Sequence, residues 1–254
     1  MTTFTFAKNR SARILVLTLT LVSSYVFGQR QIDETIAVKS GQTLNMRFDY
    51  PELIRISTWD KNEISIKGTV TINFGANDDA FELDISNQGN VISVENHIKN
   101  MKSLPQIVTI VDNGKKMIFR TKEEYRKYKA ENGSSYDVMS WGVDMDILLD
   151  IKIPKTMKTS VESVYGMVEI KDFSAPLSVV AKYGGVDAAL NETMVGELNA
   201  ETNYGQIYSN LDVKFGGEGL RERDFYTHVS AKPGRGPRFD FESEYGNVYL
   251  RKSN

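Results

Sequence analysis

Few residues in this sequence have the types and spacing that enzyme chemistry requires. The 254-residue chain has no cysteine and two histidines, His97 and His228, which lie far apart in the sequence. Disulfides, thiolate metal sites and a cysteine nucleophile are therefore excluded, and no His-Glu-x-x-His motif supports a zinc site. The sequence also lacks a Gly-x-Ser-x-Gly elbow, a phosphate-binding loop and a dinucleotide fingerprint. We expect no catalytic residue, no metal and no cofactor.

Three aspartates have the most suggestive spacing. Asp144, Asp146 and Asp150 alternate with apolar residues, which places all three carboxylates on one face of a strand. Such carboxylates can bind calcium or act as an acid/base pair on a polysaccharide. The spacing lacks the turn and the terminal glutamate of a calcium loop, so we favour the solvent-exposed face of an amphipathic strand. Asp144 and Asp146 are kept as candidates for a ligand-binding surface.

Composition and charge define the broad class. The chain is 41% hydrophobic and 25% charged with a net charge of −2, which is ordinary for a folded protein and gives no basis for nucleic-acid binding. Residues 1–28 have a basic start, an apolar run at 14–22 and small residues before Gln29, which is the layout of a secretory signal peptide. No later apolar run reaches the roughly 20 residues of a membrane span. We therefore expect an exported protein, periplasmic or at the cell surface, without a transmembrane segment after signal cleavage.

The mature chain alternates apolar and polar residues at period two, between turns rich in Asn, Asp and Gly. This pattern predicts short, half-buried strands. A hairpin with an Asn-Gly turn is expected within 107–120. Thr121 and Glu124 form a capping box ahead of good helix formers, which predicts a short exposed helix over 122–131. We therefore expect an inserted hairpin and helix at about 112–135.

The C-terminal half contains a repeat. Four segments align without gaps: TSVESVYGMVEI (159–170), LSVVAKYGGVDA (177–188), LNAETNYGQIYS (198–209) and FDFESEYGNVYL (239–250). Their tyrosine-glycine pairs are Tyr165 and Gly166, Tyr183 and Gly184, Tyr204 and Gly205, and Tyr245 and Gly246. The tyrosines are 18, 21 and 41 residues apart, and a period near 20 is typical of stacked-repeat proteins. The last step is about two units long, so one unit there is expected to have diverged or to carry a loop.

The parity inside each unit predicts which side chains are buried. Residues two, four and six positions before each tyrosine are mostly small or apolar, whereas the alternate positions are mostly charged or polar. The tyrosines therefore belong to the buried face, inside the fold or at its corner, as a structural ladder rather than a sugar-binding platform. An apolar residue three positions after each tyrosine has the opposite parity, so the glycine is expected to form a bend. Tyr208 and Tyr249 directly follow inward residues and are candidates for an outward ligand surface.

These units predict an all-β, single-stranded β-solenoid, that is, a β-helix-like fold, in which residues 29–254 form one domain with a short helical insertion. Residues 211–238, which are rich in turn residues, are expected to project as a loop. The alternative is a β-sandwich, which also has alternating strands but does not explain why like residues recur at a nearly fixed period.

Four features carry a family resemblance: STWDKNEISIKG (57–68), DILLDIKIPK (146–155), the tyrosine-glycine units and the ending SEYGNVYLRK (243–252). In this order, over most of the mature chain, they resemble the bacterial putative-adhesin family of exported β-strand-repeat proteins. The resemblance implies a β-helix-like fold and a cell-envelope setting. That family's domain is of unknown function and supplies no catalytic residues to transfer.

We therefore expect a non-enzymatic binding or structural module of the cell envelope, whose ligand is a polysaccharide or another envelope protein. Two alternatives stay open. One is a carbohydrate-active enzyme that uses surface carboxylates such as Asp144 and Asp146. The other is a sensor that reports the state of the envelope to a membrane protein partner.

Overall fold

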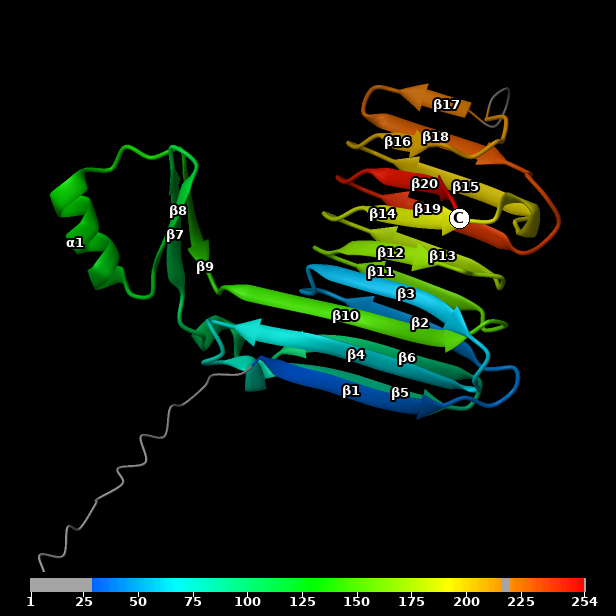
Figure 1. Cartoon of the computed structure of the whole chain (residues 1–254), viewed down its shortest axis with the longest axis horizontal. Coiled ribbons are helices and arrows are strands. Elements are labelled where there is room, and N and C mark those ends of the chain that lie inside the picture. The colour runs from blue at the N-terminus through cyan, green and yellow to red at the C-terminus, as the bar shows by residue number, and fades with distance from the viewer. Residues whose placement is uncertain (1–28, 216–219, 254) are drawn as a thin grey trace, which may run out of the picture.

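The computed structural model describes residues 29–215 and 220–253, so the signal peptide predicted for residues 1–28 lies outside the described residues. Two large β-sheets pack face to face, and a smaller unit projects from one end of the stack (Figure 1). In the part of the chain that the structure describes, no helix has both the length and the apolar composition of a membrane span.

The eight-stranded sheet has the order β1-β4-β10-β3-β12-β14-β20-β16. Its strands are β1 (Arg30–Ala37), β3 (Leu53–Trp59), β4 (Glu63–Ile72), β10 (Met145–Pro154), β12 (Met167–Lys171), β14 (Val186–Leu190), β16 (Ile207–Ser209) and β20 (Val248–Lys252). The nine-stranded sheet has the order β17-β18-β15-β19-β13-β11-β2-β6-β5. Its strands are β2 (Thr43–Phe48), β5 (Phe81–Gln88), β6 (Val91–Ile98), β11 (Thr159–Ser163), β13 (Leu177–Ala181), β15 (Glu197–Thr202), β17 (Leu220–Arg223), β18 (Tyr226–Ala231) and β19 (Arg238–Ser243). Short 3-10 turns are η1 (Asp78–Ala80), η2 (Met101–Ser103) and η3 (Glu192–Met194).

Alternating side chains build one core between the sheets. In β11, Thr159, Val161 and Ser163 are buried, whereas Ser160 and Glu162 lie on the outer face. The same period holds along most strands, and the buried residues of both sheets form one continuous hydrophobic cluster. Because successive side chains of a strand point to opposite faces, this alternation determines which face of each sheet is buried.

The all-β class with one short helix is confirmed, but the single-stranded β-solenoid is wrong. Neighbouring strands do not follow the chain as successive coils would, because β10 lies between β4 and β3, and β19 lies between β13 and β15. Antiparallel pairs also occur at both ends of the stack, including β1–β4, β5–β6 and β15–β18. Two mixed sheets that face each other are closer to the alternative, a β-sandwich. Parity could not separate the two folds because both bury alternate side chains.

Two-strand units nevertheless recur in the middle of the stack. Each crosses from the nine-stranded to the eight-stranded sheet: β2 to β3, β11 to β12, β13 to β14, β19 to β20 and β15 to β16. The C-terminal unit is out of chain order, because β19 pairs in parallel with both β13 and β15. The long last step therefore holds no diverged unit in its described residues, 205–215 and 220–244. Its residues 220–231 form the hairpin β17–β18 at the sheet edge, so the projecting loop expected there is wrong.

The projecting unit consists of β7 (Ile107–Asp112), β8 (Lys115–Phe119), α1 (Lys122–Asn132) and β9 (Val138–Gly142), with the sheet order β8-β7-β9 (Figure 1). The predicted hairpin is confirmed, and both residues of its Asn113-Gly114 turn have positive φ. The predicted helix is also confirmed: the Thr121 side chain accepts a hydrogen bond from the Glu124 amide at 3.1 Å. Sequence patterns did not reveal β9, which follows the helix in the sequence and pairs with β7.

Candidate functional site

Aromatic rings form a continuous row along one corner of the stack, where the chain crosses between the sheets. In spatial order, this aromatic ladder consists of Tyr50, Tyr165, Tyr183, Tyr245, Tyr204 and Phe225. The ring centroids of the four repeat tyrosines are 5.0–5.3 Å apart, and their planes differ by 6–13°. This spacing is close to the strand spacing, because the parallel strands beneath hold equivalent residues in register.

The expectation that these tyrosines are buried is wrong. Tyr165 and Tyr204 are each 59% exposed, Tyr183 is 49% exposed and Tyr245 is 46% exposed. The chain begins to bend one residue before each tyrosine rather than at the glycine, so the ring points out of the corner. The residue two positions before each tyrosine is buried as expected, and so is the valine three positions after Tyr165, Tyr183 and Tyr245.

The four glycines are required for close packing between neighbouring two-strand units, which we call layers. A Cβ on Gly184 would run into the carbonyl oxygen of Gly166, and one on Gly205 would run into that of Gly246. None of the four has positive φ, so the space and not the backbone conformation selects glycine. Buried hydroxyls support the same corner: Ser243 donates to the Gly184 carbonyl at 2.9 Å.

Two members of the aromatic ladder were missed from the sequence. Tyr50 follows the alternating residues of β2, and Pro51 takes the place of the glycine, so a search for the Tyr-Gly pair passes over this unit. Phe225 comes from the β17–β18 turn, which no repeat signals. It is 75% exposed and has φ 62°, a backbone strain of order 1–3 kcal/mol for a bulky residue.

Tyr208 and Tyr249 lie on the outer face of the eight-stranded sheet. They are paired across β16 and β20, with ring centroids 5.2 Å apart, and Tyr208 is 47% exposed. The Arg251 guanidinium lies 5.6 Å from the centre of the Tyr249 ring and contacts Asp187 at 2.5 Å. Burial raises the pKa of the Asp187 carboxyl, and the charge of Arg251 partly opposes that rise.

The structure does not bring the predicted ligand residues together. Asp146 lies near the start of β10 and Asp144 just before it, whereas Tyr249 lies on β20, four strands away in the same sheet. Asp144 is tied to Asn73 through its backbone: its amide donates to the Asn73 side chain at 3.1 Å. Among residues 29–215 and 220–253, no three His, Asp or Glu side chains gather as a metal site would require.

A groove crosses the outer face of the nine-stranded sheet, and the sequence did not predict it. Three hollows of about 190, 440 and 350 Å³ adjoin and share lining residues. The groove floor, as we name it, is a row of short polar side chains, one from each of five adjacent strands: Asn45, Ser160, Ser178, Asp240 and Asn199. The next row is longer and forms a wall that includes Glu162, Val180, Glu242 and Glu201.

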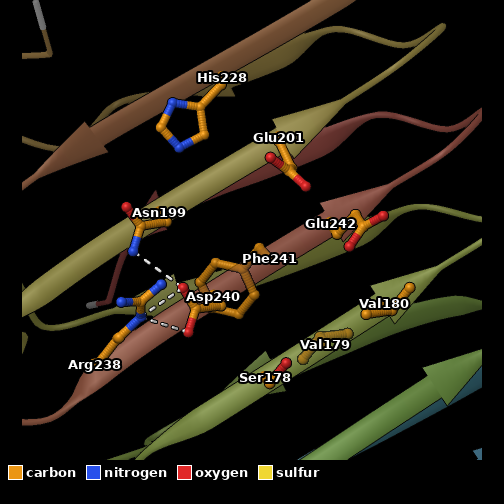
Figure 2. A pocket seen from close by; sticks show the side chains of 10 residues that line it. All are labelled: Ser178, Val179, Val180, Asn199, Glu201, His228, Arg238, Asp240, Phe241 and Glu242. Atoms are coloured by element: carbon orange, nitrogen blue, oxygen red, sulfur yellow. Dashed lines mark hydrogen bonds and ion pairs between the residues drawn. The ribbon is translucent and has the colours of Figure 1, made fainter. Parts of the chain in front are cut away.

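Figure 2 shows one end of this groove, with Asp240 held from two sides. The Arg238 guanidinium donates to both Asp240 oxygens at 2.9 and 2.8 Å, and the Asn199 amide donates at 3.0 Å. The hydrogen bond and charge of Asp240 raise the pKa of Arg238 above its ordinary value. At this end of the floor, Asn199 and Asp240 are therefore held in place by hydrogen bonds within the protein.

Carboxylates face each other on the groove wall. Glu201 and Glu242 are paired across β15 and β19, and Glu201 accepts a hydrogen bond from the Tyr226 hydroxyl at 2.8 Å. Burial raises the pKa of Glu242 most, and the nearby charges of Glu201 and Glu244 raise it further. His228 lies opposite Glu201, and its Nδ1 is buried without a hydrogen-bond partner in the described part of the chain.

No protein-family model and no curated protein matches the chain. Among solved structures, the chain is similar to a putative cell adhesion protein from Clostridium sporogenes, with a TM-score of 0.47 and 10% sequence identity. The match covers 89% of this chain and 100% of that chain. Membership of the putative-adhesin family therefore stays a prediction, and the function has to be inferred from the residues of the chain itself.

Proposed function

We propose that the protein is a non-enzymatic binding module of the bacterial cell envelope and that an extended polysaccharide lies in the groove of the nine-stranded sheet. The observation that carries this proposal is the groove floor, a straight row of short polar side chains beside a row of longer ones. Five adjacent strands give the floor a length of roughly 19 Å, which suits a chain of several sugars.

The chemistry of the lining favours a ligand rich in hydroxyls. Ser160 and Ser178 can both donate and accept, Asn45 and Asn199 offer amides, and Asp240 offers charged acceptors. Each sugar hydroxyl is likewise both donor and acceptor, so a polysaccharide can satisfy this lining along its whole length.

A tryptophan in the groove floor tests the site. Ser178→Trp fills the middle of the groove, because β13 is the central one of its five strands, and Ser57→Trp, on the outer face of β3 in the other sheet, is the matched control. Aromatic residues are favoured in strands, so both variants should fold. Binding to a panel of purified envelope polysaccharides should weaken at least about tenfold in Ser178→Trp and stay unchanged in Ser57→Trp. If Ser178→Trp binds these polysaccharides as tightly as the wild type does, the groove is not the binding site.

A second candidate function is cleavage of the same polysaccharide. The facing pair Glu201 and Glu242 favours it, because a carboxyl with a raised pKa can act as a general acid beside a charged carboxylate. Release of reducing ends by the wild type, lost in Glu242→Gln, would replace the binding proposal with this one. Loss in Asp144→Asn or Asp146→Asn instead would place the chemistry on β10. Capture of a protein and no polysaccharide from envelope extract would favour an envelope protein partner.

A further inference from the structure

We propose that the aromatic ladder is a second binding strip, and that it takes a linear chain of equatorially linked pyranose sugars, as in β-1,4-linked glycans, with one sugar beside each ring. The strip lies at the corner of the stack and is separate from the groove, whose floor residue Ser178 comes five positions before Tyr183. The inference does not depend on a ligand in the groove.

The exposed parts of the rings determine what the strip can bind. Ring faces cover one another along the row, since neighbouring planes are nearly parallel at 5.0–5.3 Å. A sugar therefore cannot stack on the faces of the inner rings. The exposed parts of these tyrosines are therefore ring edges and phenol hydroxyls, and a phenol hydroxyl is one donor and one acceptor. The Tyr245 hydroxyl already shares a hydrogen bond with Glu244. This row suits a partner that presents hydroxyl groups at a regular interval.

The interval separates a glycan from a peptide. An extended peptide advances 3.2–3.4 Å per residue, so its polar groups fall out of step with rings about 5 Å apart. A chain of equatorially linked pyranoses is straight and advances close to one strand spacing for each sugar, so it stays in step over the whole row. An α-1,4-linked chain coils and loses the match after a few sugars.

Rigidity favours binding at this strip. Each inner ring is held between two neighbours, and the backbone beneath is fixed by hydrogen bonds between layers, such as the Tyr183 amide to the Val164 carbonyl at 2.8 Å. Little side-chain freedom is therefore lost when a ligand binds. Phe225 closes the row at one end with a ring that is 75% exposed and held by a strained backbone. This strained position extends the strip by one ring.

Oligosaccharides of increasing length test the match of intervals. Isothermal titration with β-1,4-linked oligosaccharides of two to six sugars should show affinity that rises with each sugar, by about tenfold or more over the series. Malto-oligosaccharides of the same lengths should show no such rise. Equal length dependence in both series, or none in the β-1,4 series, would overturn the proposal.

Variants separate the strip from the groove. Tyr183→Phe keeps the ring stack and removes one hydroxyl from the middle of the row, and Tyr183→Ala leaves a gap there. Both variants should reduce the gain in affinity with each added sugar. Trp141→Ala, which removes a 40% exposed ring from the projecting unit, should leave that gain unchanged. Ser178→Trp should also keep the gain, even where it abolishes polysaccharide binding in the groove. If Ser178→Trp loses the gain and Tyr183→Phe keeps it, the ladder is not the site.

Discussion

Gly184→Ala is expected to destabilise the protein by about 3–5 kcal/mol, although it adds a single methyl group. The added Cβ would overlap the carbonyl of Gly166 in the layer below and lie 3.0 Å from the Tyr165 carbonyl oxygen. Both obstacles are backbone atoms in paired layers, so no side chain can move aside. The two layers would have to separate locally at the corner.

The magnitude follows from the contacts that this separation disrupts. Amides of Lys182 and Tyr183 donate to the Ser163 and Val164 carbonyls at 2.8 Å each, and the Val168 amide donates to the neighbouring layer at 2.9 Å. Each such bond contributes about 0.5–1.5 kcal/mol. The stacked ring pair Tyr165–Tyr183 contributes about as much again.

Urea unfolding followed by circular dichroism measures the effect. Gly142→Ala in β9 is the matched control, because no atom lies within 4 Å of its added Cβ and its φ is not positive. The control should unfold within about 0.5 kcal/mol of the wild type, whereas the midpoint for Gly184→Ala should drop sharply with little change in slope. A Gly184→Ala protein as stable as the control would refute close packing as the reason for glycine.

Three further perturbations test separate parts of the structure. Ser243→Ala removes the hydroxyl that donates to the Gly184 carbonyl, and calorimetry should show a loss of about 1–3 kcal/mol; an unchanged melting temperature would mean that this hydroxyl is dispensable. Thr121→Ala removes the cap of α1, so hydrogen exchange should speed up in the projecting unit by an amount equivalent to about 1 kcal/mol, and uniform exchange throughout would contradict the assignment. The raised pKa of Glu242 means that the folded state binds its proton more tightly than the unfolded state, so stability should fall as pH rises above the ordinary value of 4.5. Glu242→Gln should flatten that fall and raise the melting temperature at pH 7, with no gain well below pH 4.

Local features were readable from the sequence because they depend on neighbours along the chain. The Asn113-Gly114 turn needs two residues that tolerate positive φ, and the cap of α1 needs a threonine three positions before the amide that it accepts from. Burial of Val161 and Ser163 followed from alternation within a single unit. None of these features requires knowledge of which units are adjacent.

The groove was not predicted, although four of its floor residues, Ser160, Ser178, Asn199 and Asp240, share one position of the aligned repeats. An ordinary polar residue on an outer face carries no signal of a groove, and the fifth residue, Asn45, joins the row only through the pairing of β2 with β11. The depth of the groove depends on the difference in length between two neighbouring rows of side chains. That difference exists only once the register of five strands is fixed.

The sequence by itself determined that the chain is all-β, that the residues two, four and six positions before each repeat tyrosine are buried, and that equivalent residues would lie in register. Tertiary structure alone decided the order of the units, since β19 inserts between β13 and β15 only after the chain has passed through the β17–β18 hairpin. It also decided that the tyrosines face solvent. Alternation is a property of a straight strand, and it no longer constrains a side chain once the backbone turns from one sheet to the other.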